Sequence, residues 1–120
     1  MKITKTLKKR GLYFQDDKWE KRNIYRITIS NKDKKCSFGF RDSIVNTEKG
    51  EYPSDYDILA CVKSDYNLTK EYYPTYEDFA SEFGYGIDSI KGNRIYKSCL
   101  SQAERLQRVF TPEEIEAMPD

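Results

Sequence analysis

Histidine is absent from this sequence of 120 residues. The chain therefore lacks the commonest general base, the usual serine and cysteine triads, and the most frequent ligand of zinc and iron. Glycine is also missing where a phosphate-binding loop needs it, because Gly84–Tyr85–Gly86 has no third glycine, no lysine and no preceding strand. We therefore expect no catalytic residue, no cofactor and no metal ion, in a protein that acts by binding.

Long apolar runs and paired cysteines are missing too. No stretch approaches the roughly 18 apolar residues that span a bilayer, and the basic segment Met1–Arg10 lacks the apolar region and cleavage site of a signal peptide. Cys36, Cys61 and Cys99 are widely spaced and odd in number, which favours reduced, buried thiols over disulfides or a zinc site. These absences predict a cytoplasmic protein with no membrane partner.

Carboxylates are abundant and keep one enzymatic alternative open. Asp55, Asp57, Glu77, Asp78 and Asp88 are the residue types that a magnesium-dependent nuclease needs. All of them lie at the starts of predicted helices, where the helix dipole accounts for acidic residues without a metal. A nuclease is therefore the least favoured alternative, and it predicts magnesium-stimulated cleavage that is lost when Asp55 or Asp57 is changed.

Charge is distributed unevenly, although the net charge is only +1. Residues 1–35 hold 12 Lys and Arg against 4 Asp and Glu, whereas residues 36–90 hold 4 against 11. Residues 91–120 hold five of each sign. Such asymmetry predicts an anionic partner for the start of the chain. The alternative is that the basic and acidic parts face each other in the fold.

The first third of the chain predicts a small sheet. Ile3 and Leu7 are four residues apart, so residues 3–10 are expected to form a short helix that ends at Gly11. Residues 12–15 follow as a first strand. Apolar and polar residues then alternate over 23–30 and 35–41, with a polar turn between, which predicts an antiparallel hairpin. The expected buried face holds Tyr25, Ile27, Ile29, Cys36, Phe38 and Phe40. The opposite face would hold Arg22, Arg26, Lys35 and Arg41.

After a polar loop at 42–52, the apolar period changes from 2 to 3.6. The pattern predicts helices over about 54–66, 75–83, 89–109 and 111–118. Their expected N-caps are Ser54, Thr75, Asp88 or Ser89, and Thr111, and Gly84 is expected to end the second. The predicted fold is α+β in a single domain, residues 1–120. A short N-terminal helix and a three-stranded antiparallel sheet occupy 1–42, and three or four helices from 53–120 pack on one sheet face.

The basic start of the chain also contains aromatic residues, and that mixture suits nucleic acid or an acidic protein surface. The candidate partner-binding residues are Lys8, Lys9, Arg10, Tyr13, Trp19, Arg22, Arg26, Lys35 and Arg41. A solvated polar face remains the alternative for each of them.

One segment resembles a known group of proteins. Residues 76–85 read Tyr-Glu-Asp-Phe-Ala-Ser-Glu-Phe-Gly-Tyr, followed by Asp88–Ser89, Lys91 and Ile95–Tyr96, and preceded by Tyr56–Cys61. This pattern is similar to that of small phage and prophage proteins, mostly without assigned function, over about residues 55–110. Their setting resembles that of phage accessory proteins that inhibit host defence, such as anti-CRISPR proteins. The resemblance implies a shared fold and a phage setting, and it transfers no catalytic residue.

Within the motif itself, Phe79, Phe83 and Tyr85 are expected in the core. The leading hypothesis is a phage-encoded, non-catalytic inhibitor that binds a host defence protein or ribonucleoprotein in the cytoplasm of an infected or lysogenic bacterium. The alternative is a nucleic-acid-binding accessory protein of phage replication or regulation.

Overall fold

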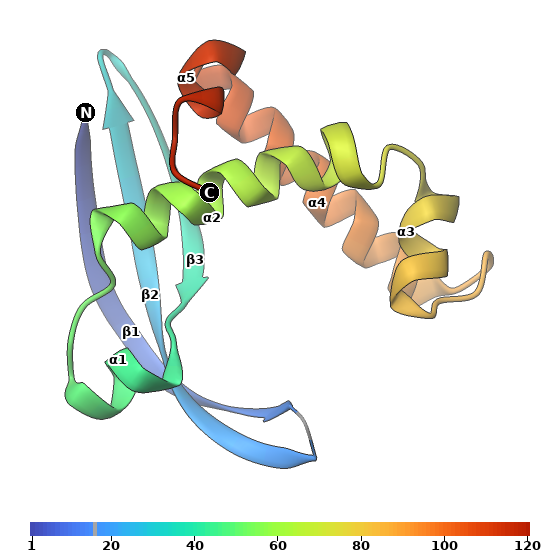
Figure 1. The fold of residues 1–120 in the computed structure, drawn as a ribbon, viewed down its shortest axis with the longest axis horizontal. Coiled ribbons are helices and arrows are strands. Elements are labelled where there is room, and N and C mark those ends of the chain that lie inside the picture. The colour runs from blue at the N-terminus through green and yellow to red at the C-terminus, as the bar shows by residue number, and fades with distance from the viewer. Residues whose placement is uncertain (16) are drawn as a thin grey trace. The chain divides into compact units, whose positions relative to one another are not determined.

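The computed structural model describes residues 1–15 and 17–120, with side chains described for all of these except residues 13–15. It shows an α+β chain in which three strands precede the helices (Figure 1). The described elements are β1 (Lys2–Gln15), β2 (Lys18–Asn31), β3 (Lys34–Arg41), α1 (Ile44–Lys49), α2 (Asp55–Asn67), the π-helical turn η1 (Leu68–Tyr72), α3 (Tyr76–Phe83), α4 (Ile90–Val109) and α5 (Pro112–Glu116). The chain divides into two compact units, Met1–Ile58 and Leu59–Asp120, with the boundary inside α2.

The first unit contains the antiparallel sheet, in the order β1-β2-β3. The predicted hairpin of 23–30 and 35–41 is confirmed, since Ile27 pairs with Phe38 and Ile29 with Cys36. The predicted buried face is also correct: Tyr25, Ile27, Ile29 and Phe38 are buried, and Cys36 and Phe40 are half-buried. The ring of Tyr52 packs against Tyr25 with centroids 5.1 Å apart. The alternation of side chains along each strand therefore separates an apolar face from a polar one.

The predicted N-terminal helix is wrong. Residues 3–10 belong to β1, which pairs with β2 from Lys2 to Gln15, and Gly11 lies inside the strand opposite Arg22. Ile3 and Leu7 share a strand face as well as a helix face, because positions four apart satisfy both periods. Lys5 lies between them on the inner face, where its Nζ lies 2.8 Å from Asp55 Oδ1. Pairing with the whole length of β2 thus outweighs the local helical pattern.

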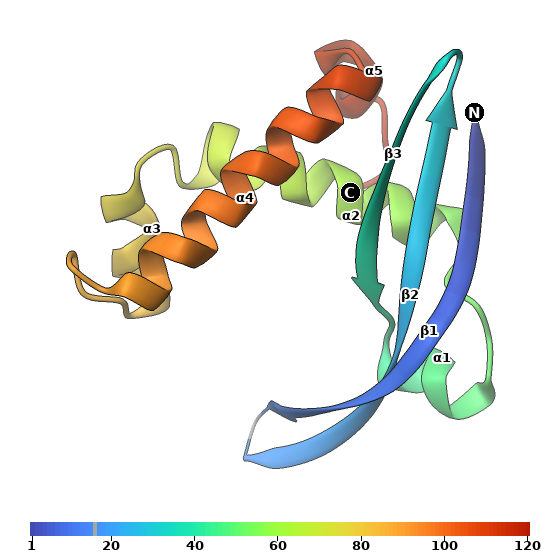
Figure 2. The ribbon, with the colours of Figure 1, turned by 180° about the vertical axis from the view of Figure 1, so that it is seen from behind.

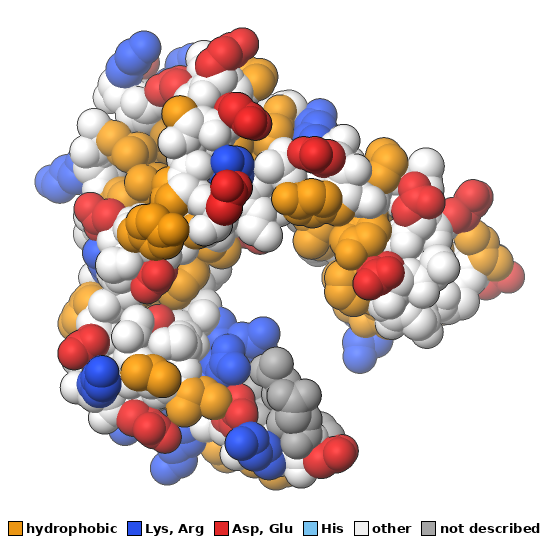
Figure 3. Space-filling model, viewed as in Figure 1, with side chains coloured by type: hydrophobic (Ala, Val, Ile, Leu, Met, Phe, Trp, Pro, Cys, Tyr) orange, Lys and Arg blue, Asp and Glu red, His pale blue; other side chains and the backbone are white. Residues whose placement is uncertain are grey.

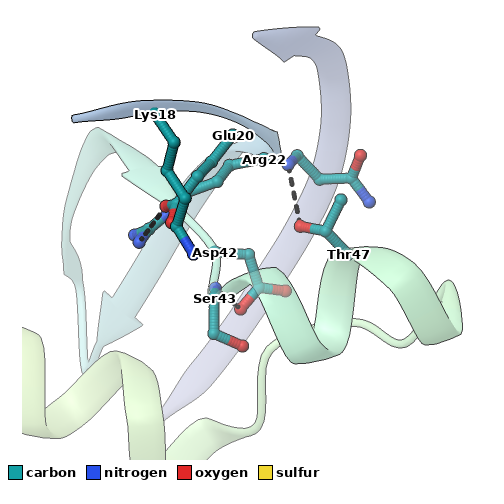
Figure 4. A network of polar contacts seen from close by, with 7 residues as sticks. Lys18, Glu20, Arg22, Asp42, Ser43 and Thr47 are labelled. Carbon is teal, nitrogen blue, oxygen red and sulfur yellow. Dashed lines mark hydrogen bonds and ion pairs between the residues drawn. The ribbon is translucent and has the colours of Figure 1, made fainter. Parts of the chain in front are cut away.

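The predicted loop at 42–52 contains α1 instead. Ser43 accepts a hydrogen bond from Asn46 N at 3.1 Å, and Gly50 ends the helix in the left-handed region, with φ of 69°. Figure 4 shows how this short helix is held against β2: Asn23 N donates to Thr47 Oγ1 at 3.0 Å. Asp42 is buried, and its Oδ1 accepts from Ser43 N and from Asn46 Nδ2. A polar network therefore fixes the segment that follows the sheet.

The predicted helix caps of the second half are confirmed. The hydroxyl oxygens of Ser54, Thr75, Ser89 and Thr111 each accept a backbone N–H three residues later. At Thr111 the capping box is complete, because Glu114 accepts the Thr111 N–H in return. Gly84 ends α3 with φ of 75°, as predicted. Between the predicted helices of 54–66 and 75–83, where no helix was expected, residues 68–72 form η1.

The second unit has an aromatic core around Phe79. The rings of Phe79 and Tyr96 lie 5.2 Å apart, and Tyr96 Oη donates to Tyr73 O at 2.6 Å. Gly92 allows α4 to approach α3 closely, because a Cβ at this position would lie 2.5 Å from Tyr76 Oη. The prediction that Phe83 belongs to the core is wrong. Its ring contacts Phe79, yet 51% of the residue is exposed.

Figure 2 shows the same ribbon from behind, with α4 crossing in front of α2 and α3. Among the described residues, no helix is long and apolar enough to cross a membrane. The expected packing of the helices on one sheet face stays a prediction.

Candidate nucleic-acid interface

The face of the sheet opposite the apolar one is basic and rich in hydroxyl groups. We call it the open face and define it by register: Lys2, Thr4, Thr6 and Lys9 of β1, Arg22, Ile24, Arg26, Thr28 and Ser30 of β2, and Lys35, Ser37, Gly39 and Arg41 of β3. Six of these thirteen side chains are cationic and none is acidic. From the row of Ser30 to that of Arg22 the face extends about 26 Å, at roughly 3.3 Å per residue.

The middle of the open face contains residues with short polar side chains and one glycine. Thr28 and Ser37 lie opposite each other, and their hydroxyl oxygens are 2.8 Å apart in a hydrogen bond. Gly39 is opposite Arg26, and nothing lies within 4 Å of the place where its side chain would begin. Small residues in the centre with cations around them leave space for a polyanion backbone to lie against the sheet.

Three of the predicted cations have no ion-pair partner in the part of the chain that the structure describes. Lys9, Arg26 and Lys35 are exposed and form no ion pair with any described residue. Arg22 differs, because its guanidinium lies 3.2 Å from Glu20 Oε2 (Figure 4). The Nζ of Lys18 also approaches Glu20, at 3.9 Å. Glu20 therefore offsets part of the positive charge at one end of the open face.

A second group of candidates gathers at the far end of the β1–β2 hairpin. Arg10 and Trp19 line a groove of about 440 Å³ together with Lys21 and with Ile44, Thr47 and Glu48 from the α1 region. Trp19 is 67% exposed. Arg10 pairs with Asn23, so by register these side chains lie on the opposite side of the sheet from Arg26. In Figure 3 basic and acidic side chains lie close together at this end of the first unit.

The nine predicted binding residues therefore do not form one patch. Lys9, Arg22, Arg26, Lys35 and Arg41 share the open face, whereas Arg10 and Trp19 line the hairpin groove. Lys8 is exposed at the register shift between Leu7 and Lys9, a β-bulge that reverses the face order of the strand. The side chain of Tyr13 lies outside the described residues.

The ion pairs bear on the two interpretations of the uneven charge, namely an anionic partner or basic and acidic parts that face each other in the fold. The pair of Lys5 with Asp55 joins the basic start of the chain to its acidic middle. Between described residues of the basic segment, ion pairs also run from Lys18 and Arg22 to Glu20 of the same strand. Internal neutralisation therefore accounts for Lys5, and it does not account for Arg26 or Lys35.

Sequence reasoning missed two sets of cations. Lys2 joins the open face because the N-terminal residues form a strand. Four exposed cations of α4, namely Arg94, Lys97, Arg105 and Arg108, share one side of that helix. The net charge of residues 91–120 does not reveal these cations, because four of the five acidic residues in that segment lie after the helix and cancel them in the sum. Their spacings of three, eight and three residues keep them on the side of the helix away from the apolar stripe, and this pattern was the available signal.

The second unit contains several groups with shifted pKa values. Burial raises the pKa of the Cys61 thiol to about 12, with a smaller contribution from the charge of Asp65. Burial also raises the pKa of Asp65, and the thiol of Cys61 donates to its Oδ2 at 3.6 Å. Asp65 and Cys99 line a mostly apolar pocket of about 310 Å³, and burial raises the pKa of Cys99 as well. Both thiols therefore stay protonated at neutral pH, where they are weak nucleophiles.

The carboxylates do not converge on a metal site within the part of the chain that the structure describes, since no three His, Cys, Asp or Glu residues are grouped so as to hold an ion. No family model, curated protein or solved structure matches this chain.

Proposed function

We propose that this chain is a non-catalytic protein that binds nucleic acid through its phosphate backbone, on the open face of the sheet. The observation that carries the proposal is the set of six cationic side chains on one polar face, where Glu20 at one end is the acidic neighbour and exposed Lys9, Arg26 and Lys35 are not paired to described acids. Backbone contacts from Lys and Arg supply most of sequence-independent affinity. Thr and Ser hydroxyls between them add hydrogen-bond donors to phosphate oxygens.

The chemistry of the open face favours backbone contacts over base recognition. Base recognition on a sheet uses aromatic rings on which the bases stack. The described side chains of the open face include no aromatic ring, and Trp19 lies on the other side of the sheet. Binding through this face is therefore independent of sequence and strongly dependent on salt.

Direct binding to an oligothymidine of about 30 nucleotides tests the proposal, because this length exceeds the roughly 4–16 nucleotides that a single-strand-binding module covers. At about 0.1 M salt each phosphate contact contributes roughly 0.7 decades of affinity. Arg26→Glu with Arg41→Glu should weaken binding at least about 25-fold and lower the salt slope by about 1.4. Fluorescence anisotropy over a salt series measures both quantities.

The matched control carries the same change of charge elsewhere. Lys49→Glu with Lys70→Glu replaces two exposed lysines, one in α1 and one in η1, neither on the open face. This variant should keep nearly the full affinity. Equal losses in the two variants would show that net charge, not the open face, governs binding, and would overturn the proposal.

The phage-like motif supports a setting for this binding. We propose that the nucleic acid is held in a host defence effector, such as a CRISPR ribonucleoprotein, whose activity the protein inhibits. A basic open face that occupies the path of the effector's guide or target strand would act without catalysis. Purified effector, incubated with the protein before its target is added, should lose cleavage, and the Arg26→Glu, Arg41→Glu variant should restore it. Cleavage that persists in excess wild-type protein would refute the setting while leaving nucleic-acid binding untouched.

A further inference from the structure

Helix α4 presents a basic row that the open face does not include. The row consists of Arg94, Lys97, Arg105 and Arg108, all exposed. The opposite side of the same helix is buried through Gly92, Tyr96, Ala103 and Leu106. At 1.5 Å per residue the row extends about 21 Å from Arg94 to Arg108. Figure 2 shows α4 crossing in front of the second unit.

A groove lies along this basic row. A groove of about 620 Å³ is lined by Arg94, Lys97, Ser98, Ser101 and Arg105 along the helix, with Asp88 at one end. Small serine residues separate the two pairs of cations, so the groove follows the helix between them. Serine hydroxyls are common donors to phosphate oxygens, and arginine binds phosphate through two parallel hydrogen bonds.

The helix dipole accounts for only one of these four cations. A cation is favoured in the last turn of a helix, which holds Arg108. Arg94, Lys97 and Arg105 lie outside the first and last turns of α4, where the dipole has little effect. Glu104 is the single acidic residue of α4 against five cations. None of the four row residues forms an ion pair with any residue in the described part of the chain. Four cations on one side of one helix repel one another, and an anionic partner that lies against them would offset this repulsion.

We propose that the α4 basic row is a second binding surface for a nucleic-acid phosphate backbone. This inference rests on the proposed function for the identity of the ligand. The residues of the α4 basic row belong to the second unit, whereas those of the open face belong to the first. Three of its four cations are arginine, which matches phosphate better than the monodentate charge of lysine does. The full chain then binds nucleic acid at two surfaces, and a long strand that reaches both is held more tightly than either surface alone would hold it.

Binding of the same labelled oligothymidine to full-length variants tests this inference. Arg94→Glu with Arg105→Glu should weaken binding at least about 25-fold near 0.1 M salt and lower the salt slope by about 1.4. Both side chains are exposed, so the variant should keep its helices, and circular dichroism checks this. The control remains Lys49→Glu with Lys70→Glu, which carries the same change of charge and should bind nearly as the wild type does.

The outcomes separate the two surfaces. If only the Arg26→Glu, Arg41→Glu variant is weakened, the α4 row does not bind and this inference is overturned, while the proposed function stands. If only the α4 variant is weakened, the proposed function of the open face fails and this inference stands. Weakening of both, with a further loss in the combined variant, supports both surfaces. If polyglutamate of equal charge competes as well as unlabelled oligothymidine, the row recognises any polyanion, and its assignment to phosphate is overturned.

Discussion

Both units of this chain place apolar side chains on one side and basic side chains on the other, but with different residue periods. In the sheet unit, every second residue of β2 from Asn23 to Asn31 is buried, so Arg26 projects from one face and Ile27 from the other. In the helical unit, α4 buries residues such as Tyr96 and Leu106 and turns Arg94 and Arg105 outward. Each unit therefore pairs an apolar side with a basic one. Net charge therefore has to be counted for each face of an element and not for each segment of the chain. Helix α4 carries five cations, although residues 91–120 have a net charge of zero.

The largest expected effect lies in the core of the sheet unit. Ile27 is fully buried between Lys5 of β1 and Phe38 of β3. Ile27→Ala removes buried methyl groups and leaves a cavity, which should lower the free energy of unfolding by about 3 kcal/mol. Ile24→Ala, on the open face of the same strand, should cost at most about 1 kcal/mol. Urea unfolding followed by circular dichroism measures both. Equal losses would contradict the assignment of the two faces.

The helical unit is sensitive to added volume instead. A Cβ at residue 92 would lie 2.5 Å from Tyr76 Oη and 2.8 Å from the side chain of Tyr85. Gly92→Ala should therefore lower the free energy of unfolding by about 2 kcal/mol, although alanine favours helices over glycine. Gly86→Ala is the control, because nothing lies within 4 Å of its added carbon. A Gly92→Ala variant as stable as the wild type would show that α3 and α4 are not closely packed there.

The buried carboxyl of the helical unit should make stability depend on pH. Burial raises the pKa of Asp65 above its ordinary value of 3.8, so the folded state favours the neutral carboxyl. Its stabilising contribution is complete below pH 3.8 and is lost as the pH rises through the higher folded-state pKa. Asp65→Asn should therefore raise the melting temperature at pH 7 and give little gain near pH 3. A gain that is constant with pH would show that the pKa of Asp65 is not raised.

The smallest expected effect concerns the hairpin groove. Trp19 lies on the other side of the sheet from the open face, so a backbone held by Arg26 does not reach it by register. Trp19→Ala should change the affinity for oligothymidine by less than about threefold, as for most residues outside the centre of an interface. A tenfold loss, measured by the same anisotropy titration, would place the binding site at the hairpin groove.

The sequence predicts the parts of this fold that local chemistry determines. The alternation over 23–30 and 35–41, the four N-caps and the turn at Gly84 follow from single residues and short periods, and the structure confirms them. The strand at residues 3–10 could not be predicted, because Ile3 and Leu7 fit both periods and the decision depends on pairing with β2. That error also concealed Lys2 and the bulge near Lys8, and so the composition of the open face.

The most direct test of the central claim uses methyl groups on the two faces of β2 as reporters. In a methyl NMR titration with oligothymidine, Ile24 and Thr28 should shift strongly, because they lie on the open face among the cations. Ile27 and Ile29, buried on the opposite face of the same strand, should shift little. That alternating response is the predicted result. Open-face methyl groups that stay unshifted in a saturated complex would contradict the account.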